Sequence, residues 1–205
     1  MIYFTSDLHL GHVRALEIMP HRPWATVDEM DAGLISNYND VVGDNDTCIF
    51  LGDVIMGRKS ENVPKYLNHL RGTKILICGN HDFLPSELKP EKLQAMEDLY
   101  LANGISEIAY GCVGLDRFTL DSNDFNIKLC HFPTADTEDD RTNEYEQRYT
   151  HLRPAIHPSQ WLLHGHTHSR DSISGVNSTH IGVDAAVWDY KPVSLDTIRK
   201  VIENK

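Results

Sequence analysis

Short apolar runs along this chain are each followed at once by small polar and ionisable residues. The runs are IYFTS, TCIFLG, KILICG, IKLC and WLLHG, and their content of Ile, Leu, Phe and Cys is typical of buried strands. The polar residues that follow them are, in chain order, Asp7, His9, Asp53, Asn80, His81, Asp82, His131, His166 and His168. The pattern therefore predicts strands that end in clusters of polar side chains.

Helical patterns lie between these strands. Residues 27–42 carry acids in the first turn and an apolar face, and residues 60–70 open with Ser60 as a candidate cap. Residues 194–204 begin with Ser194 as a predicted N-cap. Alternating strands and helices indicate an α/β fold, in which functional residues gather beyond the carboxyl ends of strands. We therefore expect one shared site.

Residues 134–159 interrupt this alternation. The segment is polar, rich in acids and poor in apolar residues, so we expect a surface insertion with a helix near residues 138–150. Its place between His131 and His166 suits a lid over the site, and a plain solvated loop is the alternative. Apart from this insertion, the 205 residues are expected to form a single domain.

Composition narrows the classes of partner and compartment. The net charge of −11 argues against binding to duplex nucleic acid, although it leaves room for a small nucleotide or phosphate site. Neither a signal-peptide pattern nor an apolar run of membrane-spanning length is present, so no membrane partner is expected. The four cysteines form no CxxC pair and are expected to be reduced thiols of a cytoplasmic protein.

The polar clusters carry the donor atoms of a metal centre. Asp7 and His9 alternate, so on a strand they would share one face and could bind one ion. Asp53 could offer one carboxylate oxygen to each of two ions, and Asn80 could offer an amide oxygen. Imidazole nitrogens would come from three further residues, His131, His166 and His168. Mixed nitrogen and oxygen donors suit divalent transition metals better than Mg²⁺, and the absence of cysteine ligands argues against a structural zinc site.

The order of these motifs resembles the signature of the calcineurin-like metallophosphoesterases, in particular their small bacterial and phage members. The resemblance runs from residue 3 to about residue 188. The matching motifs are Asp7-Leu8-His9, Gly52-Asp53, Gly79-Asn80-His81-Asp82, His131 and Gly165-His166-Thr167-His168. The resemblance implies two packed mixed β-sheets flanked by helices, in four layers α/β/β/α. It also implies two divalent ions, manganese foremost and iron, nickel, cobalt or zinc as alternatives.

The same resemblance implies a distribution of ligands and a reaction. One ion would be held by Asp7, His9 and His168, the other by Asn80, His131 and His166, with Asp53 bridging. A hydroxide between the ions would attack phosphorus in line, and His81 would protonate the leaving oxygen. Asp82 would either orient His81 or form a turn, and Asn80 would contact the substrate phosphate. His12 follows Gly11 at an expected helix start, where anions bind, so it would either contact the same phosphate or cap the helix and support a neighbouring side chain.

A phosphodiesterase acting on small phosphodiesters, with 2′,3′-cyclic nucleotides as a candidate class, is the resulting hypothesis. Phosphomonoesterase, nucleotide pyrophosphatase and nuclease activities remain alternatives of the same chemistry, and a non-catalytic binding protein ranks lower because no ligand is missing. Arg58 lacks the neighbouring Asp of the large protein phosphatases and receives no role. His164 is expected to be a hydrogen-bonded structural residue, and the oligomeric state stays open.

Overall fold

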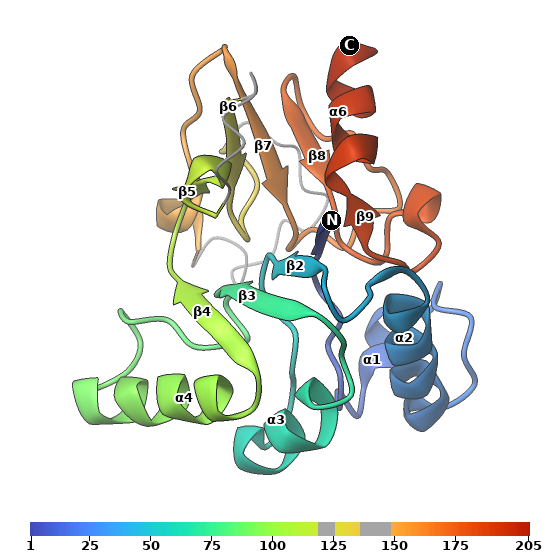
Figure 1. Ribbon diagram of the computed structural model, residues 1–205, viewed down its shortest axis with the longest axis vertical. Coiled ribbons are helices and arrows are strands. Elements are labelled where there is room, and N and C mark those ends of the chain that lie inside the picture. Colours follow the sequence, from blue (N-terminus) through green and yellow to red (C-terminus); the bar gives the residue numbers. More distant parts are fainter. Residues whose placement is uncertain (119–125, 136–148) are drawn as a thin grey trace.

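Two β-sheets form the centre of the computed structural model, which describes residues 1–118, 126–135 and 149–205 (Figure 1). The first sheet has the strand order β4-β3-β2-β1-β9, and the second has the order β5-β6-β7-β8. The strands are β1 Ile2–Thr5, β2 Thr47–Phe50, β3 Thr73–Ile77, β4 Ile105–Ala109, β5 Val113–Gly114, β6 Asn126–Leu129, β7 Gln160–His164, β8 Ser178–His180 and β9 Val193–Ser194.

Both sheets are mixed. Strands β1 to β4 run parallel to one another, and β9 pairs antiparallel with β1. Strands β6, β7 and β8 are likewise parallel, with β5 antiparallel at the edge. Parallel strands bring their carboxyl ends to one edge of a sheet, so the loops that leave them are neighbours.

The described helices surround these sheets. The α-helices are α1 Ala15–Ile18, α2 Val27–Val41, α3 Lys59–Leu67, α4 Pro90–Ala102 and α6 Leu195–Glu203, and the 3-10 helices are η1 Leu115–Arg117, η2 Thr150–Leu152 and η3 Ala186–Trp188. The helix expected near residues 138–150 lies largely outside the described residues. Helices α2, α3 and α4 lie along one side of the first sheet, and the second sheet lies on its other side (Figure 1).

The alternation of side chains along the strands explains this layering. One face of the first sheet, including Cys48 and Phe50, packs with helical residues such as Leu34. The opposite face, including Ile49, packs in a second cluster with Leu163 of the other sheet. Strands β1, β2 and β3 are thus buried on both faces, which requires the continuous apolar runs seen in the sequence. The expectation of two mixed sheets with flanking helices is confirmed.

The ends of the helices test the predicted caps. The Ser194 side chain accepts a hydrogen bond from the backbone N–H of Thr197, so Ser194 is the N-cap of α6 as predicted. The predicted cap Ser60 is wrong, because α3 begins at Lys59 and its first hydrogen bonds reach the carbonyl of Arg58. Ser60 therefore lies inside the helix.

The cysteines were expected to be unpaired thiols, and the structure agrees for all four. All four cysteines are free, and Cys48, Cys78 and Cys130 are buried while Cys112 is exposed. Within the described ranges, the helices are too short or too polar for any of them to cross a membrane.

Candidate metal centre

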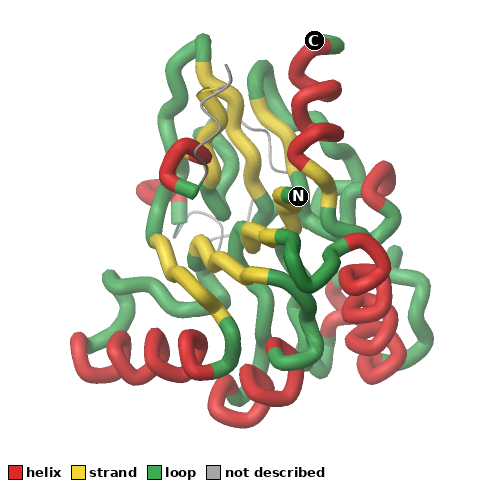
Figure 2. The backbone as a smooth tube through the Cα atoms, viewed as in Figure 1, coloured by secondary structure: helices red, strands yellow, loops and turns green. Residues whose placement is uncertain are grey.

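The predicted site residues lie just beyond the carboxyl ends of five parallel strands. Strand β1 ends at Thr5, β2 at Phe50, β3 at Ile77, β6 at Leu129 and β7 at His164, and a candidate ligand follows each within three residues. All of them stand in loop segments, which Figure 2 distinguishes from the strands. The two sheets therefore contribute jointly to one edge.

The backbone at five of these residues is left-handed rather than extended. The φ angle is 60° at Asp7, 53° at His9, 55° at Asp53, 70° at His166 and 50° at His168. The expectation that Asp7 and His9 alternate along a strand is therefore wrong, and His166 and His168 do not lie on a strand either. Asp and His tolerate this region better than most residues, yet such conformations cost on the order of 1–3 kcal/mol each and concentrate at functional sites.

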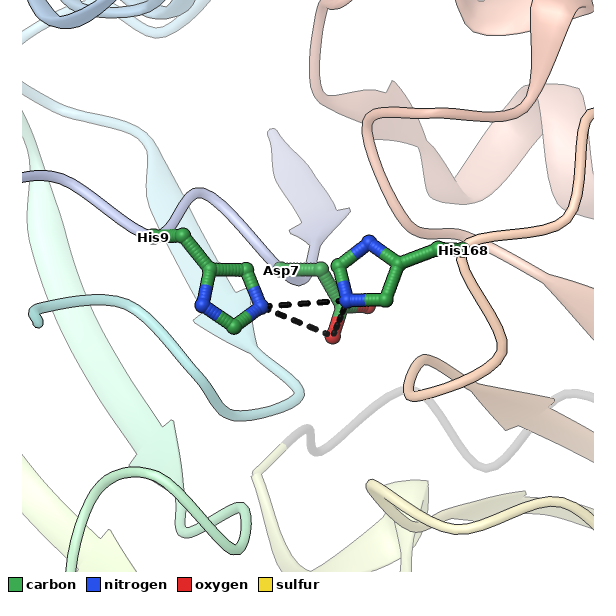
Figure 3. A group of neighbouring side chains, drawn as sticks. All are labelled: Asp7, His9 and His168. Carbon is green, nitrogen blue, oxygen red and sulfur yellow. Dashed lines mark hydrogen bonds and ion pairs between the residues drawn. The ribbon is translucent and has the colours of Figure 1, made fainter. Parts of the chain in front are cut away.

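Asp7, His9 and His168 form a first group of donor atoms (Figure 3). The Nε2 atoms of His9 and His168 are 3.2 Å apart, and each lies 3.9 Å from Oδ1 of Asp7. Asp7 is fully buried, and His9 nearly so. The left-handed backbone turns these side chains toward a common point.

Asn80, His131 and His166 form a second group. Oδ1 of Asn80 lies 2.9 Å from Nε2 of His131 and 3.0 Å from Nδ1 of His166. The two imidazole nitrogens are 3.2 Å apart. One amide oxygen and two ring nitrogens thus converge, although their residues come from strands of different sheets.

Asp53 stands between the two groups. Its Oδ2 lies 3.8 Å from Nε2 of His9 and 3.5 Å from Nε2 of His131. Its Oδ1 accepts a hydrogen bond of 2.8 Å from the backbone N–H of His81. The sequence suggested one oxygen for each ion, whereas this arrangement turns a single oxygen toward both groups.

The two groups fit divalent transition metals. Donors about 2.1 Å from one ion lie roughly 3.0–3.4 Å from one another. The donors of the second group, at 2.9–3.2 Å, and the two ring nitrogens of the first, at 3.2 Å, are close to this spacing, whereas Oδ1 of Asp7 is farther, at 3.9 Å from each ring nitrogen. The tautomers also fit, because Nδ1 of His131 donates to the Leu51 carbonyl at 2.7 Å and Nδ1 of His168 donates to Asp184 at 2.7 Å. Each ring therefore turns an unprotonated Nε2 toward its group.

The charges of the group members influence one another. Burial by itself raises the pKa of Asp7, but neighbouring His168 and His131 hold that pKa below its usual value. Burial, together with His168, keeps the pKa of His9 well below its usual value. Burial lowers the pKa of His131, yet Asp53 and Asp7 outweigh this effect and raise it. Asp7 is thus ionised and His9 is neutral, the states in which they bind metals.

The predicted catalytic and substrate residues surround these groups. The His81 ring is 5.5 Å from the His9 ring, and the His12 ring is 5.9 Å from it on centroids. The Asp82 carboxylate accepts backbone N–H groups of Gly79 at 2.9 Å, Asp53 at 2.6 Å and Val54 at 3.2 Å. The Asp82 carboxylate thus connects the loop after β3 with the loop after β2. This role is closer to the turn-forming alternative than to that of a residue that orients His81.

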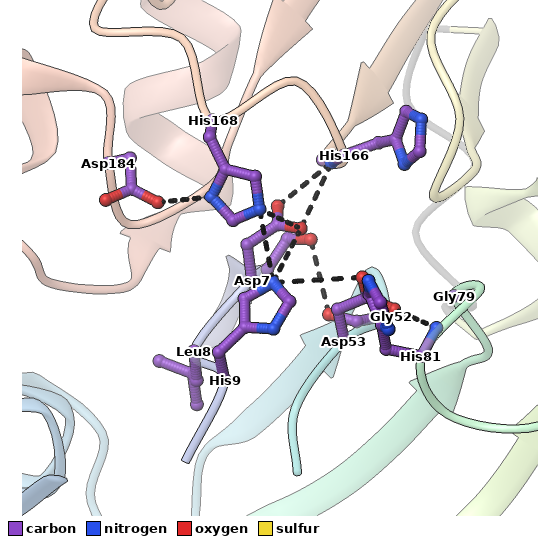
Figure 4. Close-up of polar contacts among 12 residues, drawn as sticks. Asp7, Leu8, His9, Gly52, Asp53, Gly79, His81, His166, His168 and Asp184 are labelled. Atoms are coloured by element: carbon purple, nitrogen blue, oxygen red, sulfur yellow. Dashed lines mark hydrogen bonds and ion pairs between the residues drawn. The ribbon is translucent and has the colours of Figure 1, made fainter. Parts of the chain in front are cut away.

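Sequence reasoning missed three residues beside the first group, namely His21, Arg22 and Asp184. Asp184 accepts the His168 N–H (Figure 4) and also contacts both other residues. Asp184 directly follows the short run Ile181–Val183. The other site residues also follow short apolar runs, so the same sequence pattern could have identified Asp184. Nothing in the local pattern marked Arg22.

The remaining candidates have less direct positions. His164 is buried and hydrogen-bonds to the Gly165 carbonyl and to Ser174, consistent with the expected structural role. Arg58 is exposed and pairs with Glu61 at 2.6 Å on the surface. In the segment 134–159, Tyr149 is buried and stacks on Phe132, with ring centroids 5.7 Å apart. Tyr149 therefore packs in the core beside the site.

Comparison with known proteins agrees with this geometry. A sequence model described as calcineurin-like phosphoesterase matches residues 1–170. The chain is 33% identical to the Gene 66 protein of Mycobacterium phage D29, over 99% of this chain and 96% of that protein. It is 30% identical to an uncharacterized protein of Methanocaldococcus jannaschii, over 98% and 91% respectively. A crystal structure of a protein of unknown function from Aquifex aeolicus shares the fold, with a TM-score of 0.68, 24% identity and coverage of 98% and 99%.

Proposed function

The chain belongs to the calcineurin-like phosphoesterase family, a family of metal-dependent phosphoesterases, and on this basis we propose that it is a phosphodiesterase of small phosphodiesters, 2′,3′-cyclic nucleotides among them. The observation that carries the proposal is the pair of donor groups that share Oδ2 of Asp53. We assign Asp7, His9 and His168 to one ion and a second set, Asn80, His131 and His166, to the other.

Bound divalent ions, with manganese proposed first, would supply Lewis acidity and neutralise charge on the phosphoryl group. The protein residues would orient the substrate and move the proton. Nδ1 of His12 accepts the backbone N–H of Arg14 at 3.1 Å, so the ring proton resides on Nε2 and can be donated to a phosphate oxygen. His81 is assigned the proton donor to the leaving oxygen, because its partly exposed ring stands beside His9.

The charge of the site supports a diester over a monoester. Arg22, the arginine in contact with the first group, is fully buried, and its N–H groups are directed to Asp184 and to the backbone carbonyls of Asp7 and Leu8. The Arg22 guanidinium is therefore not free to neutralise the second negative charge of a phosphate monoester. A diester carries one negative charge, a monoester up to two. The overall charge of −11 also disfavours long polyanions, which makes small substrates the better candidates.

The free cysteines and the net charge support proposals for the compartment and the partners. Four free cysteines suit a reducing compartment, so we propose a cytoplasmic location. The expected partner is a small phosphoester or nucleotide rather than duplex nucleic acid.

A substrate panel assayed with added Mn²⁺ tests the proposal. Bis(p-nitrophenyl) phosphate and 2′,3′-cyclic nucleotides should give a higher kcat/KM than p-nitrophenyl phosphate or a short oligonucleotide. The Asp53→Asn variant, purified in parallel, controls for contaminating hydrolases. A preference for the monoester would favour the phosphomonoesterase alternative, and metal-loaded protein without any turnover would favour a binding protein.

A further inference from the structure

Asp184 is a buried carboxylate directly behind the first donor group. Its Oδ2 accepts Nδ1–H of His168 at 2.7 Å and an Nη2–H of Arg22 at 2.8 Å. Its Oδ1 accepts Nε–H of Arg22 at 2.9 Å and Nε2–H of His21 at 2.7 Å. Each carboxylate oxygen thus receives one imidazole and one guanidinium donor, a fully occupied arrangement (His168 and Asp184 in Figure 4).

Arg22 connects this carboxylate to the opposite loop of the site. Its side chain is fully buried, and beyond Asp184 it donates to the carbonyl of Asp7 at 2.7 Å and to the carbonyl of Leu8 at 3.0 Å. Asp7 has a φ angle of 60°, a conformation that needs support from its surroundings. One guanidinium therefore holds the strained backbone that presents Asp7 and also fixes the carboxylate that orients His168.

The group that contacts Nδ1 distinguishes His168 from His131 and His9. Arg22 forms an ion pair with Asp184 through two hydrogen bonds, Nη2–H to Oδ2 at 2.8 Å and Nε–H to Oδ1 at 2.9 Å, so a permanent positive charge faces the carboxylate. His168 therefore donates to a charged carboxylate, while His131 donates to the neutral Leu51 carbonyl. Nδ1 of buried His9 has no hydrogen-bond partner among the described residues. A carboxylate behind a ligating imidazole fixes its orientation and strengthens it as a donor.

We propose that Arg22 and Asp184 are positioning residues that set the affinity of one of the two metal ions, the one assigned to Asp7, His9 and His168. This inference rests on the proposed metal site. The second group is held by contacts of its own, since Nδ1 of His131 donates to the Leu51 carbonyl and Oδ1 of Asn80 contacts both rings, so its ion should be bound largely independently. Removing the pair should make a two-ion protein into one that holds a single ion tightly.

Equilibrium dialysis against Mn²⁺, with bound ion followed by electron paramagnetic resonance, measures this directly and without turnover. Asp184→Asn should weaken one of two ions by about 10–100-fold and leave the other unchanged. Repeating the substitution in a His131→Ala background, where the first group alone is complete, should reduce the remaining affinity by the same factor. Asp46→Asn is the matched control, because Asp46 supports a turn at the amino end of β2 by accepting the Gly43 N–H at 2.9 Å.

Two further variants keep the test decisive. Arg22→Lys retains the positive charge but loses the paired guanidinium N–H donors. If Asp184→Asn fails to fold, Arg22→Lys should produce the same selective weakening of Mn²⁺ binding at one site. His21→Gln changes only a donor to Oδ1, so it should alter Mn²⁺ affinity much less than either. Equal weakening of both ions, or none, in the folded variants overturns the inference. Wild-type protein that binds no Mn²⁺ would instead refute the proposed function.

Discussion

Removing the His81 side chain should separate proton donation from metal binding. The backbone N–H of residue 81, rather than its ring, donates to Oδ1 of Asp53 at 2.8 Å, and alanine keeps that N–H. Oδ2 of Asp53 should therefore stay between His9 and His131. We expect His81→Ala to retain both ions and its thermal stability, because the lost ring is only partly buried.

The expected rate loss depends on the leaving group. A positioned general acid contributes typically 10²–10⁴-fold, equivalent to about 2.7–5.5 kcal/mol of transition-state stabilisation. A 2′,3′-cyclic nucleotide expels a strongly basic alkoxide, so it should lose kcat/KM over that range. Bis(p-nitrophenyl) phosphate expels a weakly basic nitrophenolate that needs little protonation, so its loss should be about tenfold or less by the same Brønsted argument.

The assay compares kcat/KM for both substrates in wild-type protein, His81→Ala and His12→Ala, with metal content determined for each sample. His12→Ala is the matched control, since His12 lies beside the same His9 ring and is assigned to phosphate binding. It should reduce both substrates alike, mainly through KM. An equal loss on both substrates for His81→Ala with the metals retained would refute the assignment of His81 as the acid.

Three other perturbations have expected outcomes. Asp53→Asn should lose metal, measured by elemental analysis, and nearly all diester turnover, because a neutral amide cannot serve both groups; near-normal turnover with two ions bound contradicts this. Replacing residues 136–148 by a short linker, which keeps the buried Tyr149, should raise KM for nucleotides or admit longer oligonucleotides while nitrophenyl-diester turnover persists, and an unchanged substrate profile identifies a plain loop. Burial, aided by repulsion from His180, lowers the pKa of His164 to about 3. Burial, partly offset by the Asp7 carboxylate, lowers the pKa of His180 to about 4, so both histidines are neutral in the folded protein. The unfolded chain binds these protons below about pH 6.5, whereas the folded chain does not. Lowering the pH below that value should therefore reduce the free energy of unfolding by about 1.4 kcal/mol per pH unit for each histidine. Chemical denaturation at several pH values should show a shallower pH dependence for His164→Gln than for the wild type.

The α/β class, the edge that carries the site and the types of donor could all be read from local patterns. Buried strands need continuous apolar runs, and a run that stops at Asp53 or His131 marks a strand end whatever the rest of the chain does. The conformations beyond those ends could not be read in this way. Asp7 and His9 were expected on a strand, but contacts with neighbouring loops hold their backbones in the left-handed region.

Pairings across the chain were decided by tertiary packing alone. Asp184 lies 16 residues from His168 and 162 from Arg22, so no local period connects them. Asp82 illustrates the same limit, since its neighbour His81 suggested a catalytic pair while its carboxylate instead accepts the N–H groups of Gly79, Asp53 and Val54. Residue type and spacing determine which atoms can bind a metal, because these are properties of short segments. Which buried carboxylate orients which ring depends on two sheets meeting at one edge, and only the folded chain brings those edges together.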